Sequence, residues 1–327
     1  MPTNRRRVPV SLGFWLTFGA AALLATGPKA EEGVKLFESG RYGPARTALE
    51  AAAKEDPKDA RAALYLGRVL LNANDLDTAV AWLEKAAALD PKSSENELWL
   101  GRAYGSQAMK ANFLKQASLA GKVRKAFEKS VELDPANIDG RLSLIDYYLQ
   151  APGIMGGSVE KAREQAAEIA RRDPMRGHRA AGRIAEYEKH FDTALAAYER
   201  AAKEFPGKRE PHFWIAGCHS RQKQYGKALD AMEKLLAEQP GEPSALFQVG
   251  VFAGVSGERL ERGEECLKLY LQHSPKPDEP SLVSAHYRLG LLYEKKGNRD
   301  LARREYAAAL ELDPSRQDVR DALKKLS

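Results

Sequence analysis

This 327-residue chain contains little cysteine and carries only a small net charge. Two cysteines, Cys218 and Cys266, are too few for a disulfide scaffold or, by themselves, for a structural zinc site. The 51 lysines and arginines exceed the 45 aspartates and glutamates by only six. Residues 1–30 hold four of the basic residues and no acid, which leaves +2 for the rest. Nucleic-acid-binding domains are usually far more basic, so we expect no nucleic-acid partner.

Catalytic motifs are absent as well. The chain has no G-x-S-x-G elbow, no H-E-x-x-H pair, no G-x-x-x-x-G-K-[ST] loop and no G-x-G-x-x-G fingerprint. Its densest group of metal-ligating residues is His212, Cys218 and His219, but Cys218 points about 100° away from the helical face that the two histidines share. We therefore expect no enzyme, no metal and no cofactor. Each cysteine is expected to be a buried free thiol, and a disulfide between them is the alternative.

Only one long apolar run occurs, and it lies at the N-terminus. Arg5, Arg6 and Arg7 precede the mostly apolar stretch from Val8 to Ala25, an order typical of a signal peptide. Eighteen helical residues span about 27 Å, slightly less than a bilayer core of about 30 Å. We interpret residues 1–30 as a signal peptide, with an N-terminal anchor as the alternative. The chain is then periplasmic or otherwise exported, and anchored in the inner membrane if the leader is retained.

Internal periodicity is the strongest signal in the sequence. Prolines that follow Asp or another helix-ending residue recur at intervals of 32 to 44 residues: Pro57, Pro91, Pro135, Pro174, Pro206, Pro240, Pro275 and Pro314. Small residues recur in register with them, at Gly33, Gly67, Gly101, Gly182, Ala216, Gly250 and Gly290. Alanines lie twelve residues before most of these prolines, at Ala45, Ala79, Ala162, Ala194, Ala228 and Ala302. The register predicts eight repeats of a helical pair.

Within each unit the pattern is that of packed amphipathic helices. Apolar residues recur at helical spacing, as in Ala45, Ala48, Leu49 and Ala52. The small residues let the two helices of a pair approach closely, and each proline ends the preceding helix. After Pro91, the residues from Ser94 to Glu97 predict a capping box that opens the next helix. Because one pair cannot cover its own apolar face, neighbouring pairs must stack into an all-α solenoid.

These residues resemble the tetratricopeptide repeat family across nearly all of the chain after residue 30. The family's pattern is nearly complete in the last repeat, in Leu289, Gly290, Tyr293, Gly297, Ala302, Tyr306, Ala309, Leu310, Asp313 and Pro314. The resemblance implies a right-handed superhelix of about eight helix pairs over residues 31–315. Residues 316–327, charged on most faces, are expected to form a C-terminal capping helix.

Two repeats are longer than the family's usual length. The third is ten residues longer than the second, and its extra residues between Gly105 and Val123 keep a helical pattern, so we expect extended helices. The fourth is five residues longer and carries a glycine-rich segment from Ala151 to Ser158. We expect a surface loop there with Ser158 as the N-cap of the next helix. A backbone anion site in this loop is the alternative.

The resemblance also indicates a binding surface, because the first helix of each pair forms the inner wall in this family. That rule places ten residues on the wall: Arg61, Arg68, Arg102, Arg176, Arg179, Arg183, Arg221, Phe213, Phe247 and Tyr287. Arginines pair with carboxylates and aromatics supply contact area, so we expect another protein as the partner, through a segment with an acidic and an apolar part. Alternatively, the arginines pair with Glu186 and other local acids, and the aromatics pack between helices. The paired Lys and Asn positions of the family's chaperone-tail clamp are not reproduced.

The predicted function is a non-catalytic protein-interaction scaffold in the cell envelope that holds a partner segment in its concave groove. The alternative is an accessory or tethering subunit of an envelope assembly, such as polysaccharide export or outer-membrane biogenesis. Contact with a membrane is expected only through the N-terminal segment, if it is not cleaved.

Overall fold

A computed structural model describes residues 28–276, 279–314 and 316–326, which form seventeen α-helices and one 3-10 turn and contain no strand. Residues 1–27 of the predicted leader lie outside this part. The first four pairs are α1 (Pro28–Glu38) and α2 (Tyr42–Glu55), α3 (Ala60–Asn72) and α4 (Leu76–Leu89), α5 (Ser94–Lys110) and α6 (Phe113–Leu133), and α7 (Ile138–Gln150) and α8 (Val159–Arg172). The next four are α9 (Pro174–Tyr187) and α10 (Phe191–Glu204), α11 (Glu210–Arg221) and α12 (Tyr225–Glu238), α13 (Pro243–Ser256) and α14 (Leu260–Tyr270), and α15 (Leu282–Lys295) and α16 (Arg299–Leu312). The turn η1 (Gly153–Met155) lies between α7 and α8, and α17 (Gln317–Lys325) follows the last pair. About eight pairs were expected, and the described residues form eight.

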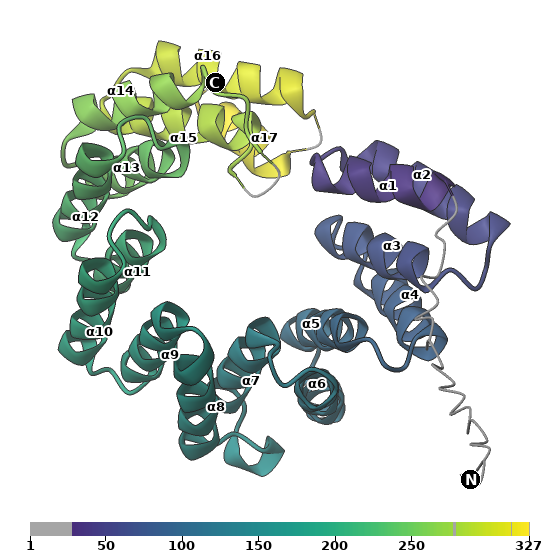
Figure 1. Cartoon of the computed structure of the whole chain (residues 1–327). Coiled ribbons are helices and arrows are strands. Elements are labelled where there is room, and N and C mark those ends of the chain that lie inside the picture. The colour runs from purple at the N-terminus through teal and green to yellow at the C-terminus, as the bar shows by residue number, and fades with distance from the viewer. Residues whose placement is uncertain (1–27, 277–278, 315, 327) are drawn as a thin grey trace, which may run out of the picture.

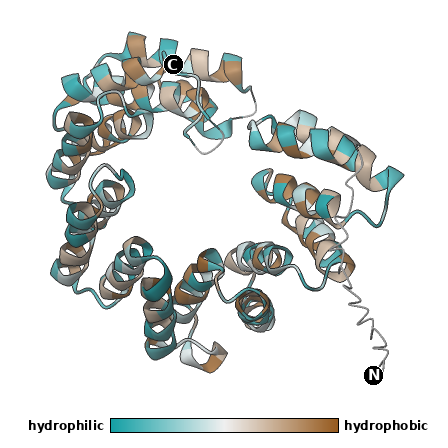
Figure 2. Ribbon diagram, viewed as in Figure 1, coloured by the Kyte–Doolittle hydropathy of each residue, from teal (hydrophilic) through white to brown (hydrophobic). Residues whose placement is uncertain are grey.

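The pairs stack into a solenoid that curves around an open centre (Figure 1). From α3 to α15 the odd-numbered helices, which are the first helices of the pairs, lie on the inner side of the curve. The even-numbered helices lie on the outer side. Hydrophobic and hydrophilic residues alternate along the helices, so each helix has an apolar face that its neighbours cover (Figure 2). None of the helices in the described part is long and apolar enough to cross a bilayer.

Small residues set the distance between the two helices of a pair. A Cβ atom added to Gly67 would lie 2.5 Å from Cγ of Leu83, and one added to Gly290 would lie 2.3 Å from Cε1 of Tyr306. The alanines that recur before the prolines are fully buried on the second helices: Ala45, Ala79, Ala162, Ala194, Ala228 and Ala302. The predicted close crossings are therefore confirmed.

The N-cap of α5 differs from the prediction by one residue. Ser93 is the cap, and its hydroxyl accepts a hydrogen bond from the backbone N–H of Asn96 at 3.2 Å. The hydroxyl of Ser94 donates instead to the carbonyl of Ser130 at 2.8 Å, on the second helix of the same pair. Glu97 is buried and forms an ion pair with Lys129. The capping box at Ser94 was wrong because the turn after Pro91 places the cap two residues beyond the proline, as the turns before Asp59 and Asn137 also do.

Both insertions take the predicted form. The extra residues of the third repeat lengthen α5 to 17 and α6 to 21 residues, with only Ala111 and Asn112 between them. In the fourth repeat the glycine-rich segment forms a loop around η1, and Ser158 caps α8 by accepting a hydrogen bond from the N–H of Lys161 at 3.2 Å. Helical extension and the cap at Ser158 are confirmed.

The two ends of the array are also packed. Ala30 is fully buried in a small cluster with Ala52 and Ala62, so α1 belongs to the repeat core although the predicted leader ran to residue 30. At the other end, α17 packs on α16 through Val319 and Ala322, both buried.

Candidate protein-binding surface

All ten predicted site residues lie on the first helices of their pairs. The arginines belong to α3, α5, α9 and α11, and the aromatics to α11, α13 and α15. These helices form the inner side of the curve in Figure 1. The concave wall therefore carries the residues that the position rule selected, although they differ in how much of their surface and charge is available.

Four of the seven arginines form ion pairs within the protein. Arg68 pairs with Glu95 at 3.2 Å, Arg176 with Asp139 at 3.1 Å, Arg183 with Asp146 at 3.1 Å, and Arg221 with Glu186. Each of these pairs joins two neighbouring inner helices. For these four arginines the alternative prediction, that they pair with nearby acidic residues of the same chain, is confirmed.

The remaining three arginines stack on aromatic rings. The guanidinium carbon lies 5.8 Å from the ring of Tyr65 in Arg61, 4.6 Å from Trp99 in Arg102 and 5.9 Å from Trp214 in Arg179. Among the described residues, none of the three has a carboxylate partner in an ion pair. A ring holds a guanidinium in place without neutralising it. Arg61, Arg102 and Arg179 are thus oriented cations that can accept a carboxylate from outside.

Burial affects one of these cations. The pKa of Arg102 is lowered, chiefly because burial penalises the charged form, and the neighbouring cation Arg68 adds to the effect while Asp139 and Glu95 oppose it. An arginine stays protonated despite such a shift. A carboxylate brought to Arg102 would therefore restore favourable interactions that burial has removed.

The sequence analysis missed the rings beneath these arginines. Arg68 lies within 4.7 Å of three ring centres, those of Phe37, Tyr65 and Trp99, so the first helices of the first three pairs share one aromatic cluster. Tyr65 and Arg68, and likewise Trp99 and Arg102, are three residues apart. Side chains at that spacing meet on one helical face, and this signal could have found them.

The three predicted aromatics are packing residues to different degrees. Phe247 is only 7% exposed and lies 5.4 Å from the ring of Tyr270 in the core. Phe213 and Tyr287 are half-buried, and the ring of Tyr287 lies 5.9 Å from that of Tyr306. Phe247 therefore offers almost no surface to a partner, whereas Phe213 and Tyr287 keep part of theirs.

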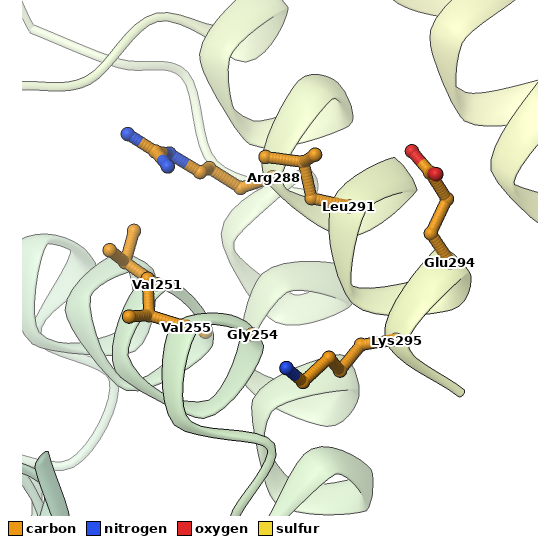
Figure 3. A pocket seen from close by; sticks show the side chains of 8 residues that line it. Val251, Gly254, Val255, Arg288, Leu291, Glu294 and Lys295 are labelled. Atoms are coloured by element: carbon orange, nitrogen blue, oxygen red, sulfur yellow. The ribbon is translucent and has the colours of Figure 1, made fainter. Parts of the chain in front are cut away.

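A hollow of about 370 Å³ lies between α13 and α15 on the inner wall (Figure 3). Val251, Val255 and Leu291 give it apolar walls, and Arg288 and Lys295 stand at its sides. Glu294 also lines it but accepts a hydrogen bond from the hydroxyl of Tyr306. The C-terminal half of the wall can therefore take an apolar side chain beside two cations.

The cysteines and histidines have structural surroundings. Cys218 and Cys266 are buried free thiols, as expected, and burial raises the pKa of each to about 11. His212 lies 3.2 Å from Glu238, and His219 lies 3.0 Å from the side-chain oxygen of Gln224. In the described part of the chain no group of three His, Cys, Asp or Glu residues could hold a metal ion.

Comparison with known proteins agrees with the architecture. Family models described as tetratricopeptide repeat match residues 31–94, 179–243 and 283–316. The chain belongs to the tetratricopeptide repeat family. Proteins of this family generally serve as protein-interaction scaffolds, and the fold is typically non-catalytic.

The similar curated proteins are much longer than this chain. The general transcriptional corepressor ssn6 of Schizosaccharomyces pombe is 26% identical over 140 residues, which cover 43% of this chain and 12% of that protein. The general transcriptional corepressor trfA of Dictyostelium discoideum is 26% identical over 122 residues, which cover 37% of this chain and 8% of that protein. The shared part is therefore a stretch of repeats.

Among solved structures, a monomeric mutant of IFIT1 with m7Gppp-AAAA has a TM-score of 0.53 and is 18% identical, with 90% of this chain and 70% of that chain covered. A thermophilic tetratricopeptide repeat protein of Thermus thermophilus is also 18% identical, with a TM-score of 0.44, and 68% of this chain and 96% of that chain are covered. At this identity the likeness of IFIT1 shows the fold alone.

Proposed function

We propose that this protein is a non-catalytic scaffold of the cell envelope that holds an acidic and apolar segment of a partner protein against its concave wall. The observation that carries this proposal is the set of three arginines, Arg61, Arg102 and Arg179, each stacked on a ring and lacking an ion-pair partner among the described residues. Oriented guanidinium groups bind carboxylates strongly, and half-buried aromatic side chains beside them supply contact area.

Site-specific photocrosslinking tests the surface. A photoreactive phenylalanine derivative in place of Arg61, on the inner helix α3, should crosslink a partner. The same group in place of the exposed Arg200, on the outer helix α10, is the matched control and should not. Crosslinks from position 200 alone would move the binding site to the convex face and contradict the proposal.

Binding measurements with the captured partner test the chemistry. Replacing Arg102 and Arg179 with alanine together should weaken binding at low salt, and the difference from wild type should shrink in high salt because salt screens exposed charges. Arg200→Ala is the control. If the double variant binds normally while its circular dichroism is unchanged, carboxylate recognition by these arginines is wrong.

The envelope location rests on the sequence of residues 1–30, with its basic start and its apolar run. A reporter that is active only after export, fused after Ser327, should be active in cells. If that fusion is inactive while a fusion to a reporter that works only in the cytosol is active, the envelope location is contradicted. A tethering role in an envelope assembly differs from the scaffold role in the identity of the partner, which the crosslink also reports.

A further inference from the structure

The two insertions expose more apolar surface than any other part of the described chain. Met109, Phe113 and Leu114 in the third repeat are 79%, 65% and 80% exposed, and Ile154 in the fourth is 89% exposed. The other large apolar side chains that are exposed reach at most 54%. The core of the repeats does not use these four side chains. Exposed apolar surface concentrated in this way usually marks a site of interaction.

A groove of about 610 Å³ lies between α5, α6, α7 and η1, and of the four exposed side chains Met109 lines it. We call it the insertion groove; its apolar lining includes Met109, Val123, Phe127, Leu142, Pro152 and Met155. Its volume is within the range of about 300–1,000 Å³ that is common for binding sites. Arg102, Asp139 and Arg179, on three inner helices, also line it, so the groove opens onto the concave wall.

Hydrogen bonds hold the loop side of the insertion groove in place. The hydroxyl of Tyr147 donates to the carbonyl of Met155, and the N–H of Ser158 donates to the carbonyl of Tyr148 at 2.9 Å. Gly156 has φ of +96°, a conformation that favours glycine, and it lies against the side chain of Arg124. A loop that is fixed in this way presents a preformed surface, which lowers the entropic cost of binding.

The inner mouth of the insertion groove is lined by charged side chains of both signs. Asp139 and Asp146 line the mouth, but each already forms an ion pair at 3.1 Å, Asp139 with Arg176 and Asp146 with Arg183. Arg102 and Arg179 line the same mouth and have no ion pair with any residue that the structure describes. The uncompensated charge at the mouth is therefore positive, and the rest of the lining is mostly apolar.

We propose that the insertion groove binds a peptide segment of a partner protein that places large apolar side chains between the third and fourth repeats and a carboxylate at Arg102 and Arg179. This inference rests on the proposed scaffold function and adds to it a location and a sequence preference. The insertions supply the apolar part of the site, and the ordinary repeats supply the cations.

Selection from a random 12-residue peptide display library against the full chain tests the preference without knowledge of the partner. Enriched peptides should combine large apolar residues with at least one acidic residue. A synthetic, fluorescein-labelled copy of an enriched peptide then serves as the probe in fluorescence anisotropy.

Two variants and two matched controls locate the peptide. Met109→Asp should raise the dissociation constant at least about tenfold, since it puts a charge on an apolar contact surface. Arg102→Ala combined with Arg179→Ala should raise it by a similar factor at low salt and by less at high salt. Leu312→Asp, at another exposed apolar residue, and Arg200→Ala should leave it unchanged. Met109 is 79% exposed, so its substitution is compatible with an intact fold, which circular dichroism checks.

Methyl NMR of methionine gives a readout that does not depend on substitutions. The methyl signals of Met109 and Met155, which line the groove, should shift when the peptide is added. The signal of Met232, which is fully buried in α12, is the internal control and should stay in place.

The outcomes separate this inference from the function it rests on. If the peptide loses affinity for Arg61→Ala but binds Met109→Asp normally, the scaffold function stands and the insertion groove is wrong. If Met109→Asp instead converts a dimer of the full chain to a monomer and the peptide signals do not move, the patch is a self-association surface and the proposal fails. If no peptide is enriched over an empty support, both proposals fail.

Discussion

Replacing Gly290 with alanine tests the packing that defines the repeats. Gly290 lies in α15, where the helix crosses α16, and the added Cβ atom would stand 2.3 Å from Cε1 and 2.7 Å from Cδ1 of Tyr306. Non-bonded carbon atoms prefer about 3.5–4.0 Å, so the ring would have to move by about 1 Å. Tyr306 is fully buried and its hydroxyl donates to Glu294, which leaves the ring little room.

Two opposing effects set the magnitude. Overpacking in a closely packed core costs about 1–3 kcal/mol, and a displacement of this size in a fixed ring favours the upper end. Alanine in place of glycine inside a helix stabilises the helix by about 1 kcal/mol. We therefore expect Gly290→Ala to lower the free energy of unfolding by about 2 kcal/mol, the difference of the two effects. Gly290→Leu adds further atoms at the same place and should cost more.

Gly121→Ala is the matched control. Gly121 lies inside α6, and a Cβ atom added there would have no neighbour within 4 Å, so only the helix propensity acts. This variant should gain up to about 1 kcal/mol. Urea denaturation followed by circular dichroism measures both variants. In a Tyr306→Ala background, Gly290→Ala should no longer destabilise, because its contact is gone.

The result that would refute this reasoning is a Gly290→Ala protein with a denaturation midpoint at or above that of the wild type. A loss that persists unchanged in the Tyr306→Ala background would show that the ring is not the cause.

Three further predictions concern the ends of the array, its ion pairs and its thiols. Deletion of residues 316–327 should expose the apolar face of α16 and promote association, and a truncated protein that stays monomeric with an unchanged midpoint would contradict the capping role. Burial raises the pKa of Glu264, but hydrogen bonds from two lysines and a tyrosine outweigh it and lower the pKa to about 2. This group stabilises the fold fully above pH 4.5 and loses that contribution as the pH falls toward 2, so Glu264→Gln should show a smaller loss of stability than wild type over that interval. Because burial raises the pKa of both Cys218 and Cys266 to about 11, neither should react with a thiol reagent at pH 8 until urea unfolds the chain, and rapid labelling of the native protein would show that the thiols are accessible.

The fold could be predicted from the sequence because it is local and repeated. Each helix pair forms from residues within about 34 positions of one another, and each pair meets its neighbours in the same way. A glycine at the crossing and a proline after the second helix therefore carry the same meaning in every copy. The error at Ser94 concerned one residue within a turn, where only the hydrogen bond that the N–H of Asn96 donates to the hydroxyl of Ser93 decides the cap.

The candidate site was predictable in part. The family's position rule assigned the ten residues to the first helices of the pairs, and the structure places those helices on the inner side of the curve. Position cannot tell an engaged arginine from an available one. Arg183 and Arg179 lie one helical turn apart on α9, yet Arg183 meets Asp146 of α7, whereas Arg179 stacks on Trp214 of α11.

By itself, then, the sequence determined the helix pairs and their number, since those depend on short-range spacing that every repeat restates, and the resemblance to the family indicated which helices face inward. The tertiary structure decided which inner residues keep a charge or a surface to offer. Arg102 and Arg179, 77 positions apart in the chain, line one groove together with Met109 and Met155 only because α5, α6, α7 and α9 are stacked side by side. Contacts between different repeats depend on how the pairs are rotated against each other, and no local pattern in the sequence encodes that rotation.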